Sequence, residues 1–454
     1  MSVESPAVTR VEAEAQERAA PAVRRIALAR ADIILCVIMF AMAIIPRAAW
    51  VAYNDRAPQG LNDPTLYVIY GDLIADGKGY TNFTGEAVGY YPVGYPAMLG
   101  ALKKGGDIFG WGRSTFSIKM MNGVFGALTV VMIYLLASRL FDRRVGFAAG
   151  ALLSVFPSQV FYTGTVLSEA QFTMLMVLAL LILLWNPWRR EGMPYGQLFA
   201  AGVVLSAATM TRGITMMLPL VLLAVWLFYL ASKKRALLQT LVLFAGIAVL
   251  IVPWSIRNTL VFDTLSGPST NLGDDLCIGN FQGATGSFVL TGKCFEGFEN
   301  VTGQQLEIER SKHGTKTAIK DVLNHPVRMP KLIAYKAYWL VFHDEDGLWA
   351  AESYGNDWFI SHPRREILAF AANATYYATA LLMIVGAAAF VLSKDLRRLF
   401  LFLTLLYILA IPLVFFGDPR FHFPAVPLAV VVAAATVIAF WDNRRAAQPR
   451  EATT

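Results

Sequence analysis

Apolar runs long enough to cross a membrane recur along almost the whole of this chain of 454 residues. A helix needs roughly 20 apolar residues to span the hydrocarbon of a bilayer. The composition, 56% hydrophobic and only 16% charged, excludes an ordinary soluble protein of this size. The sequence therefore predicts an all-α polytopic membrane protein, a bundle of about ten transmembrane helices. The predicted spans are 31–53, 115–138, 146–164, 168–185, 196–211, 214–231, 237–255, 366–392, 398–416 and 423–441.

Short clusters of Lys and Arg separate these runs and set the expected orientation. With ten spans, all of the clusters fall on one side of the bilayer, which is then the cytoplasmic side. The net charge of +7 therefore reflects membrane orientation and does not indicate a nucleic-acid partner. The clusters are Arg24-Arg25, Arg143-Arg144, Arg189-Arg190, Lys233-Lys234-Arg235, Arg397-Arg398 and Arg444-Arg445.

The same orientation places two long polar segments on the opposite, non-cytoplasmic face. The first is the external loop 54–114, in which 65–75 is expected to form an interfacial helix. The second, 256–365, is expected to be a small external loop domain with a helix at 304–324 and an amphipathic interfacial helix at 329–341. The predicted organisation is a disordered cytoplasmic tail (1–30), a transmembrane core (31–255), the loop domain, C-terminal transmembrane helices (366–441) and a cytoplasmic tail (442–454).

Three cysteines are present. Cys36 lies in the first predicted span and is expected to serve packing. Cys277 and Cys294 lie together in the loop domain, on the side of the membrane where oxidation is permitted, and we predict a disulfide between them.

Two acids at the outer ends of the spans are candidates for catalysis, because an ionisable group at the edge of a membrane bundle is costly unless it is paired or functional. Asp63 follows the first span, and Glu169 begins the fourth. Each has a structural alternative: Asp63 is also suited to cap a helix, since Pro64 follows it, and Glu169 is suited to stabilise a helix N-terminus. Asp55 and Asp72 are weaker candidates that resemble solvated loop charges.

Three arginines are expected at the non-cytoplasmic ends of the spans, where positive charge is unusual in membrane proteins. They therefore call for an anionic partner. Arg212, Arg257 and Arg420 are the arginines in question, and phosphate suits them because guanidinium presents a planar fork to its oxygens. Anchoring at the membrane surface is the alternative for Arg212 and Arg257, and pairing with Asp418 is the alternative for Arg420.

His422 is expected to be a satisfied interfacial histidine rather than a base or a metal ligand. The sequence has no Cys/His metal spacing, no phosphate-cradling glycine loop and no nucleophile elbow, which disfavours an ATP-driven pump and a serine hydrolase. No cofactor is therefore expected to be required. The sequence leaves open whether Asp63 and Glu169 share a divalent ion.

The order of several motifs resembles a known family. The loop motif Tyr67-x-x-Tyr70-Gly71-Asp72, followed by Gly77-Lys78-Gly79-Tyr80 and Tyr91-Pro92-Val93-Gly94-Tyr95-Pro96, is the first part of the pattern. It continues with Pro157 and Ser168-Glu169, Gly279-Asn280, His325-Pro326 with Lys336, and Asp418-Pro419-Arg420. Together with the external Asp63, this set is similar to the membrane glycosyltransferases of the GT-C fold, in particular bacterial relatives of protein O-mannosyltransferases and lipid A aminoarabinose transferases.

The resemblance implies a GT-C-like bundle that uses a polyprenyl-phosphate sugar as donor. The implied location is the bacterial cytoplasmic (inner) membrane, with the site facing away from the cytoplasm and membrane lipids as surroundings. Asp63 matches the acid that acts as base in the family, whereas Glu169 stands where the family often has Asp. Acceptor recognition then falls to 256–365, and the acceptor is a glycan, a lipid or a protein.

These expectations combine into one mechanism. Asp63 takes the proton of an acceptor hydroxyl, while Arg212, Arg257, Arg420 or Lys336 stabilises the departing lipid phosphate. The aromatic residues Tyr67, Tyr91 and Tyr95, together with His422, are candidate substrate contacts. The competing interpretations are a secondary transporter or lipid flippase, which would favour repeated halves, and a scaffold protein without catalysis.

Overall fold

The computed structural model describes residues 29–298 and 300–447, so the predicted tail at 1–30 lies almost entirely outside the described residues. The all-α prediction is confirmed: within the described part of the chain, β pairing is limited to one isolated bridge between Thr81 and Ala87. The helices of the bundle are α2 (Arg30–Tyr53), α5 (Thr115–Leu140), α6 (Arg143–Ser154), α7 (Pro157–Phe161), α8 (Glu169–Leu184), α9 (Tyr195–Thr211), α10 (Leu218–Tyr229), α11 (Lys233–Phe262), α17 (His362–Val391), α18 (Leu396–Ala410) and α19 (Val426–Ala447).

Each predicted span coincides with a helix or a helix pair, but the count of ten is not confirmed. Six helical segments among the described residues are long and apolar enough to cross a membrane, or seven if α6 and the segment that follows it are one bent span. That segment begins at Pro157, where the axis turns by 58°. Proline has no N–H to donate and disfavours helix in the residue before it, so the break is expected there.

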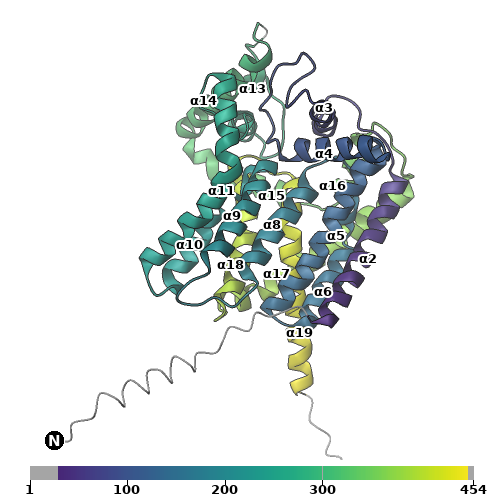
Figure 1. The fold of residues 1–454 in the computed structure, drawn as a ribbon, viewed down its shortest axis with the longest axis vertical. Helices are drawn as coiled ribbons and strands as arrows, with labels where there is room; N and C mark the ends of the chain where they lie inside the picture. The colour runs from purple at the N-terminus through teal and green to yellow at the C-terminus, as the bar shows by residue number, and fades with distance from the viewer. Residues whose placement is uncertain (1–28, 299, 448–454) are drawn as a thin grey trace, which may run out of the picture.

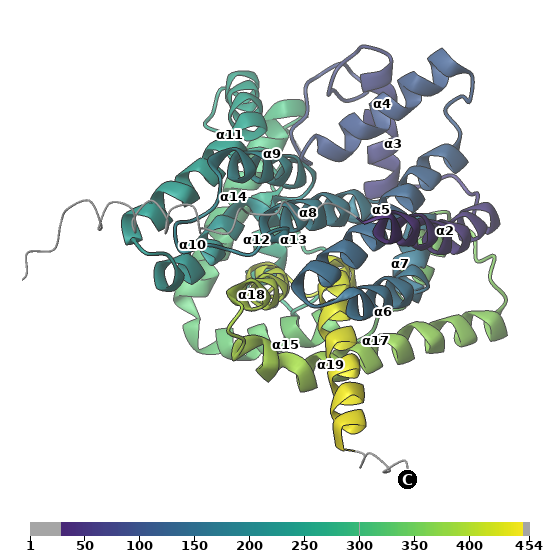
Figure 2. The ribbon, with the colours of Figure 1, turned by 60° about the horizontal axis from the view of Figure 1, so that its bottom comes forward.

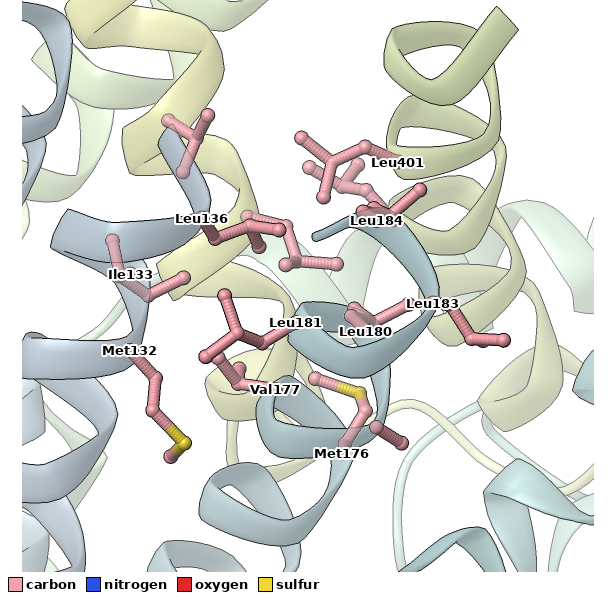
Figure 3. Packing of buried hydrophobic residues seen from close by; sticks show 14 of the residues in the cluster. Met132, Ile133, Leu136, Met176, Val177, Leu180, Leu181, Leu183, Leu184 and Leu401 are labelled. Atoms are coloured by element: carbon pink, nitrogen blue, oxygen red, sulfur yellow. The ribbon is translucent and has the colours of Figure 1, made fainter. Parts of the chain in front are cut away.

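α8 lies at the centre of the bundle, between α9 and α5 (Figure 2). From Met174 to Leu184 its sequence is apolar on every face, and such a helix is buried all round. Figure 3 shows Leu184 of α8 beside Leu401 of α18, in the buried cluster that also includes Met176 and Leu180 of α8 and Leu136 of α5. The central helix therefore carries one acid, at its outer end, into the middle of the molecule.

The polar segments predicted to be external gather at one end of the bundle (Figure 1). The first loop holds α3 (Asp63–Ala75) and α4 (Gly94–Phe109). The loop domain holds α12 (Leu272–Asn280), α13 (Gly292–Phe295), α14 (Gly303–Asn324), α15 (Met329–Val341) and α16 (Asp346–Ser353). Short 3₁₀ segments complete the chain: η1 (Tyr162–Gly164), η2 (Gly213–Met217), η3 (Pro326–Arg328), η4 (Ile411–Val414) and η5 (Pro419–Ala425).

The predicted disulfide between Cys277 and Cys294 is present and ties α12 to α13. Both cysteines are fully buried, in a small apolar cluster with Phe281. Cys36 is free, as expected for a cysteine of the first span. The bond fixes one end of α12, and that helix contributes to the site described next.

Candidate functional site

Asp63 is placed by the first turn of α3. The N-cap of this helix is Asn62, whose side chain accepts from the Thr65 amide at 3.1 Å, and Pro64 follows in the first turn. Asp63 is therefore not the cap, and the capping alternative for it is wrong. Its carboxylate is instead held from the other side of the loop, where the Tyr91 hydroxyl donates to Oδ1 at 2.6 Å.

Glu169 stands at the outer end of the central helix, where Ser168 is the N-cap residue. Its side chain is only 1% exposed. Oε1 accepts from Arg212 Nη1 at 2.5 Å, and the same nitrogen lies 3.3 Å from the Ser168 hydroxyl. Arg212 occupies the break between α9 and η2, so two interruptions in the apolar pattern meet at this point.

Arg420 joins the two acids. The turn that carries it, η5, is capped by Asp418, whose Oδ1 accepts from the Arg420 backbone amide at 2.9 Å. The guanidinium donates from Nη1 to Asp63 Oδ2 at 2.8 Å and from Nε to Glu169 Oε1. Asp418 therefore shapes the turn, and the alternative in which Asp418 and Arg420 merely pair as side chains is wrong. Asp63, Glu169, Arg212 and Arg420 are called the acid–arginine cluster below.

The cluster balances two carboxylates with two guanidinium groups. Balance matters because a buried charge that loses its partner costs several kcal/mol. Burial raises the pKa of the Asp63 carboxyl, but attraction to Arg420 and hydrogen bonds from Tyr91 and Arg420 outweigh it, so the net pKa lies below the ordinary value. Asp63 is consequently an anion at neutral pH.

Exposure separates the two acids. The Asp63 side chain is 33% exposed, against 1% for Glu169, while Arg420 and Arg212 are 14% and 15% exposed. A ligand arriving from outside can therefore reach Asp63 and both arginines but not Glu169. Glu169 Oε2 is buried and has no hydrogen-bond partner in the described part of the chain.

Two predicted phosphate ligands have their contacts elsewhere. Arg257 donates to the backbone carbonyls of Val88 at 2.8 Å and Tyr80 at 3.1 Å, so it braces the first external loop. Lys336 is fully buried, and its ammonium donates to Asn280 Oδ1 at 2.8 Å. Burial lowers the pKa of Lys336 to about 8. The structure therefore does not bring these two cations into the acid–arginine cluster.

His422 is buried, and both of its ring nitrogens are occupied. Nδ1 lies 2.6 Å from the Leu340 carbonyl oxygen and Nε2 lies 2.8 Å from Asp344 Oδ1. Its ring also stacks on Tyr376 at 4.8 Å. This matches a satisfied histidine that fastens η5 to the end of α15, and it argues against His422 as a substrate contact.

The three predicted aromatic contacts differ in position. Tyr91 touches the cluster directly through Asp63. The Tyr67 ring packs 4.8 Å from that of Tyr91 and 5.1 Å from that of Tyr95. Tyr95 is fully buried and its hydroxyl is bonded to Asn122. Tyr67 and Tyr95 therefore support Tyr91 from behind, and Tyr95 is too deep to meet a substrate.

Asp275, in the first turn of α12, is a neighbour of the cluster that the sequence reading missed. The run Gly273-Asp274-Asp275 indicates a turn, and two successive acids in the external domain were the available signal of a site. Asn271 Nδ2 donates to Asp275 Oδ2 at 3.0 Å. Burial, together with repulsion from the neighbouring Asp274 and Asp63, raises the pKa of Asp275 to about 7 against the attraction of Arg212 and Arg420.

A pH dependence of stability follows from Asp275. Folded protein keeps this proton up to about pH 7, whereas the unfolded chain loses it near pH 3.8, so the folded state binds more protons in between. The stability contribution of this group therefore falls as pH rises from about 4 to about 7. Asp275→Asn removes the effect, so the melting temperature of the variant relative to wild type should rise between pH 5 and pH 8. An identical difference at both pH values would contradict this assignment.

Comparison with known proteins gives one family match and several structural matches. Residues 101–256 match the family model described as dolichyl-phosphate-mannose-protein mannosyltransferase. No curated protein matches the sequence. The archaeal oligosaccharyltransferase AglB from Archaeoglobus fulgidus, in complex with an inhibitory peptide and a dolichol-phosphate, is 14% identical with a TM-score of 0.53, over 92% of this chain and 51% of that one.

Two further structures extend the comparison. The same oligosaccharyltransferase in complex with Zn and sulfate is 15% identical with a TM-score of 0.53, over 90% of this chain and 49% of that one. ArnT from Cupriavidus metallidurans bound to undecaprenyl phosphate is 14% identical with a TM-score of 0.39, over 90% and 78% of the two chains. The chain spans about half the length of the oligosaccharyltransferase it matches, and the likeness to that structure establishes a shared fold.

The carboxylates of the acid–arginine cluster are engaged by arginine in this structure. The described residues contain no group of three or more His, Cys, Asp or Glu side chains able to hold an ion. Asp63 Oδ2 and Glu169 Oε1 already accept from guanidinium groups. The positive charge beside these two acids comes from Arg212 and Arg420.

Proposed function

We propose that this chain, a multi-pass membrane protein with the fold of the GT-C glycosyltransferases, moves a sugar from a polyprenyl-phosphate donor to an acceptor hydroxyl on the non-cytoplasmic face. The observation that carries the proposal is the meeting of an accessible carboxylate, Asp63, with two accessible guanidinium groups, Arg212 and Arg420, at one end of the bundle. The match to a mannosyltransferase family model supports a lipid-linked sugar donor, as does the dolichol-phosphate bound to AglB.

The reaction is a displacement at the anomeric carbon. The acceptor hydroxyl gives its proton to Asp63 as its oxygen bonds to that carbon, and the bond from the carbon to the phosphate oxygen breaks. Asp63 already accepts one hydrogen bond on each oxygen, but a carboxylate has about four acceptor sites, so room for the hydroxyl remains. The lipid phosphate leaves with the bonding electrons.

Arg212 and Arg420 stabilise that departing phosphate. Both arginines are bound to Glu169, which is too deeply buried to meet the substrate. Glu169 therefore acts as a positioning residue that holds the two guanidinium groups in place. Fixed donors aimed at developing charge are effective because they need no reorganisation during the reaction. The proposed phosphate ligands are thus Arg212 and Arg420, without Arg257 and Lys336.

The loop domain is proposed to recognise the acceptor. Its α12 meets the first loop at one end, where Asp274 Oδ2 accepts from the Tyr90 hydroxyl at 3.2 Å. At its other end, Asn280 donates to the Val414 carbonyl at 2.9 Å, just before η5. α12 therefore runs from the loop that holds Asp63 to the turn that holds Arg420.

Purified full-length protein supplied with a panel of polyprenyl-phosphate sugars and hydroxyl acceptors tests the proposal. We expect release of polyprenyl phosphate that depends on the acceptor and appears for one class of sugar. Movement of labelled donor between leaflets without release would instead identify a flippase. Absence of both, in protein that binds the donor lipid, would leave a non-catalytic role and overturn the proposal.

A further inference from the structure

A groove whose lining contains no residue of the acid–arginine cluster is not used by the proposed function. It has a volume of about 530 Å³, within the range of small-molecule pockets. α7 lies between α2 and α17 in this region (Figure 2). The groove is lined by Pro46, Ala49, Trp50, Tyr53, Val160, Ile360, Arg364, Ile367 and Leu368.

The walls of the groove belong to the two spans most exposed to the bilayer. Of the most apolar 18-residue windows, those of α2 and α17 are only 22% and 17% buried, against 39% to 67% for the other four spans. The floor is a buried cluster that includes Trp50, Val160 and Phe161. A hollow with an apolar lining that opens between two lipid-facing helices suits a hydrocarbon chain rather than water.

The groove lies at the outer end of α2, beside a group of aromatic side chains. Tyr53 packs against Phe359 at 5.3 Å, and Trp50 donates from its indole nitrogen to the Phe161 carbonyl at 2.8 Å. Tyr and Trp are enriched at the level of lipid headgroups. A lipid lying here would therefore have its tail along the groove and its headgroup near the first turn of α17.

Arg364 is the one charged residue in the lining. It is exposed, and no hydrogen-bond or ion-pair partner is found for it in the described part of the chain. The nearby Arg365 differs, because its Nε is 3.1 Å from Glu352 Oε2. Glu366 does not compensate Arg364, since two residues along a helix is about 200° around its axis, whereas Ile367 and Leu368 share the face of Arg364.

We propose that this groove is a binding site for an anionic phospholipid, with one acyl chain between α2 and α17 and the headgroup phosphate on Arg364. An unpaired guanidinium at the outer level of a membrane protein is complementary to a phosphate diester that carries a net negative charge. A zwitterionic lipid offers the same tail but places a cation beside the phosphate. The site therefore selects by headgroup charge, and this selection does not depend on the proposed transferase activity.

Photo-crosslinking of the full chain in phosphatidylcholine nanodiscs tests the site. Phosphatidylglycerol or phosphatidylcholine with a photoreactive acyl chain is added at equal mole fraction, and adducts on 45–53 and 364–370 are counted by peptide mass spectrometry. We expect about fivefold more adducts with phosphatidylglycerol, because one basic residue near a membrane surface favours an anionic lipid by that order.

Three variants that elute like wild type complete the experiment. Arg364→Gln should bring the two lipids to equal labelling, and Ala49→Trp, which fills the groove, should reduce labelling by both. Arg189→Gln removes an exposed cation between α8 and α9 and should keep the wild-type preference. Equal labelling in wild type, a preference that survives Arg364→Gln, or full labelling of Ala49→Trp would each overturn the proposal.

Discussion

Asp63→Asn is expected to lower sugar transfer by about 10²–10⁴-fold, the contribution of a positioned general base. The substitution keeps the volume of the side chain and an oxygen to accept from Tyr91, but it removes the negative charge that takes the acceptor proton. Turnover is measured as released polyprenyl phosphate, with donor binding measured separately. Binding should persist, because Arg212 and Arg420 remain.

Two other acids of the first loop supply matched controls. Asp55 is exposed, and Asp72 is paired with Lys103 at 2.7 Å, so neither lies in the acid–arginine cluster. Asp55→Asn should transfer sugar like wild type, and Asp72→Asn should affect stability more than turnover. If Asp63→Asn also turned over like wild type, Asp63 would not be the base.

Arg420→Gln is expected to destabilise the protein because two carboxylates then share one guanidinium, with an upper limit of about 3–5 kcal/mol, the cost of breaking a fully buried ion pair. The substitution removes the guanidinium that joins Asp63 to Glu169, and Glu169 is buried with Arg212 as its other cation. Denaturation monitored by a fluorescent thiol probe or by loss of monodisperse protein measures the effect.

A double variant distinguishes the effect of unbalanced charge from the effect of a changed side-chain shape. Glu169→Gln combined with Arg420→Gln removes a buried charge of each sign, so it should be more stable than Arg420→Gln alone. The transfer activity of the double variant should stay low, because the phosphate has lost one of its two guanidinium ligands, that of Arg420. Equal stability of the single and double variants would show that the excess negative charge left by Arg420→Gln does not act through Glu169.

The positions of the helices were predictable because hydropathy and breaks in it depend on local sequence. Pro157 and Arg212 mark interruptions in apolar sequence, and the chain turns at both. The number of spans was less predictable. α8, α9 and α10 are 16, 17 and 12 residues long, and length decides whether such helices cross a membrane.

Four charged residues that the sequence singles out lie together in the structure, and their roles in catalysis stay predictions. Asp63, Glu169, Arg212 and Arg420 each interrupt or flank apolar sequence at the same end of the bundle, and the structure brings them together. Arg257 flanks apolar sequence at that end as well, but apart from its neighbour Asn258 it donates to two backbone carbonyls, and no side-chain pattern in a sequence specifies a carbonyl.

The roles of Asn62 and Asp275 could not be predicted from the sequence. Both Asn62 and Asp63 are good N-cap residues, and the choice between them rests on a single hydrogen bond to the Thr65 amide. Asp275 lies beside Asp63 only because α12 folds back across the first loop, a long-range arrangement. Its two acids in succession at a helix start are equally typical of an ordinary turn.

The bridge made by Arg420 has a consequence for biogenesis. Arg420 precedes the last helix of the described chain and is separated by 357 positions from Asp63 and by 251 from Glu169. While the polypeptide is still leaving the ribosome, both acids are already translated and their shared cation is not. The acid–arginine cluster can thus form only after Arg420 has been translated, so under the proposed function a chain that stops before Arg420 is inactive.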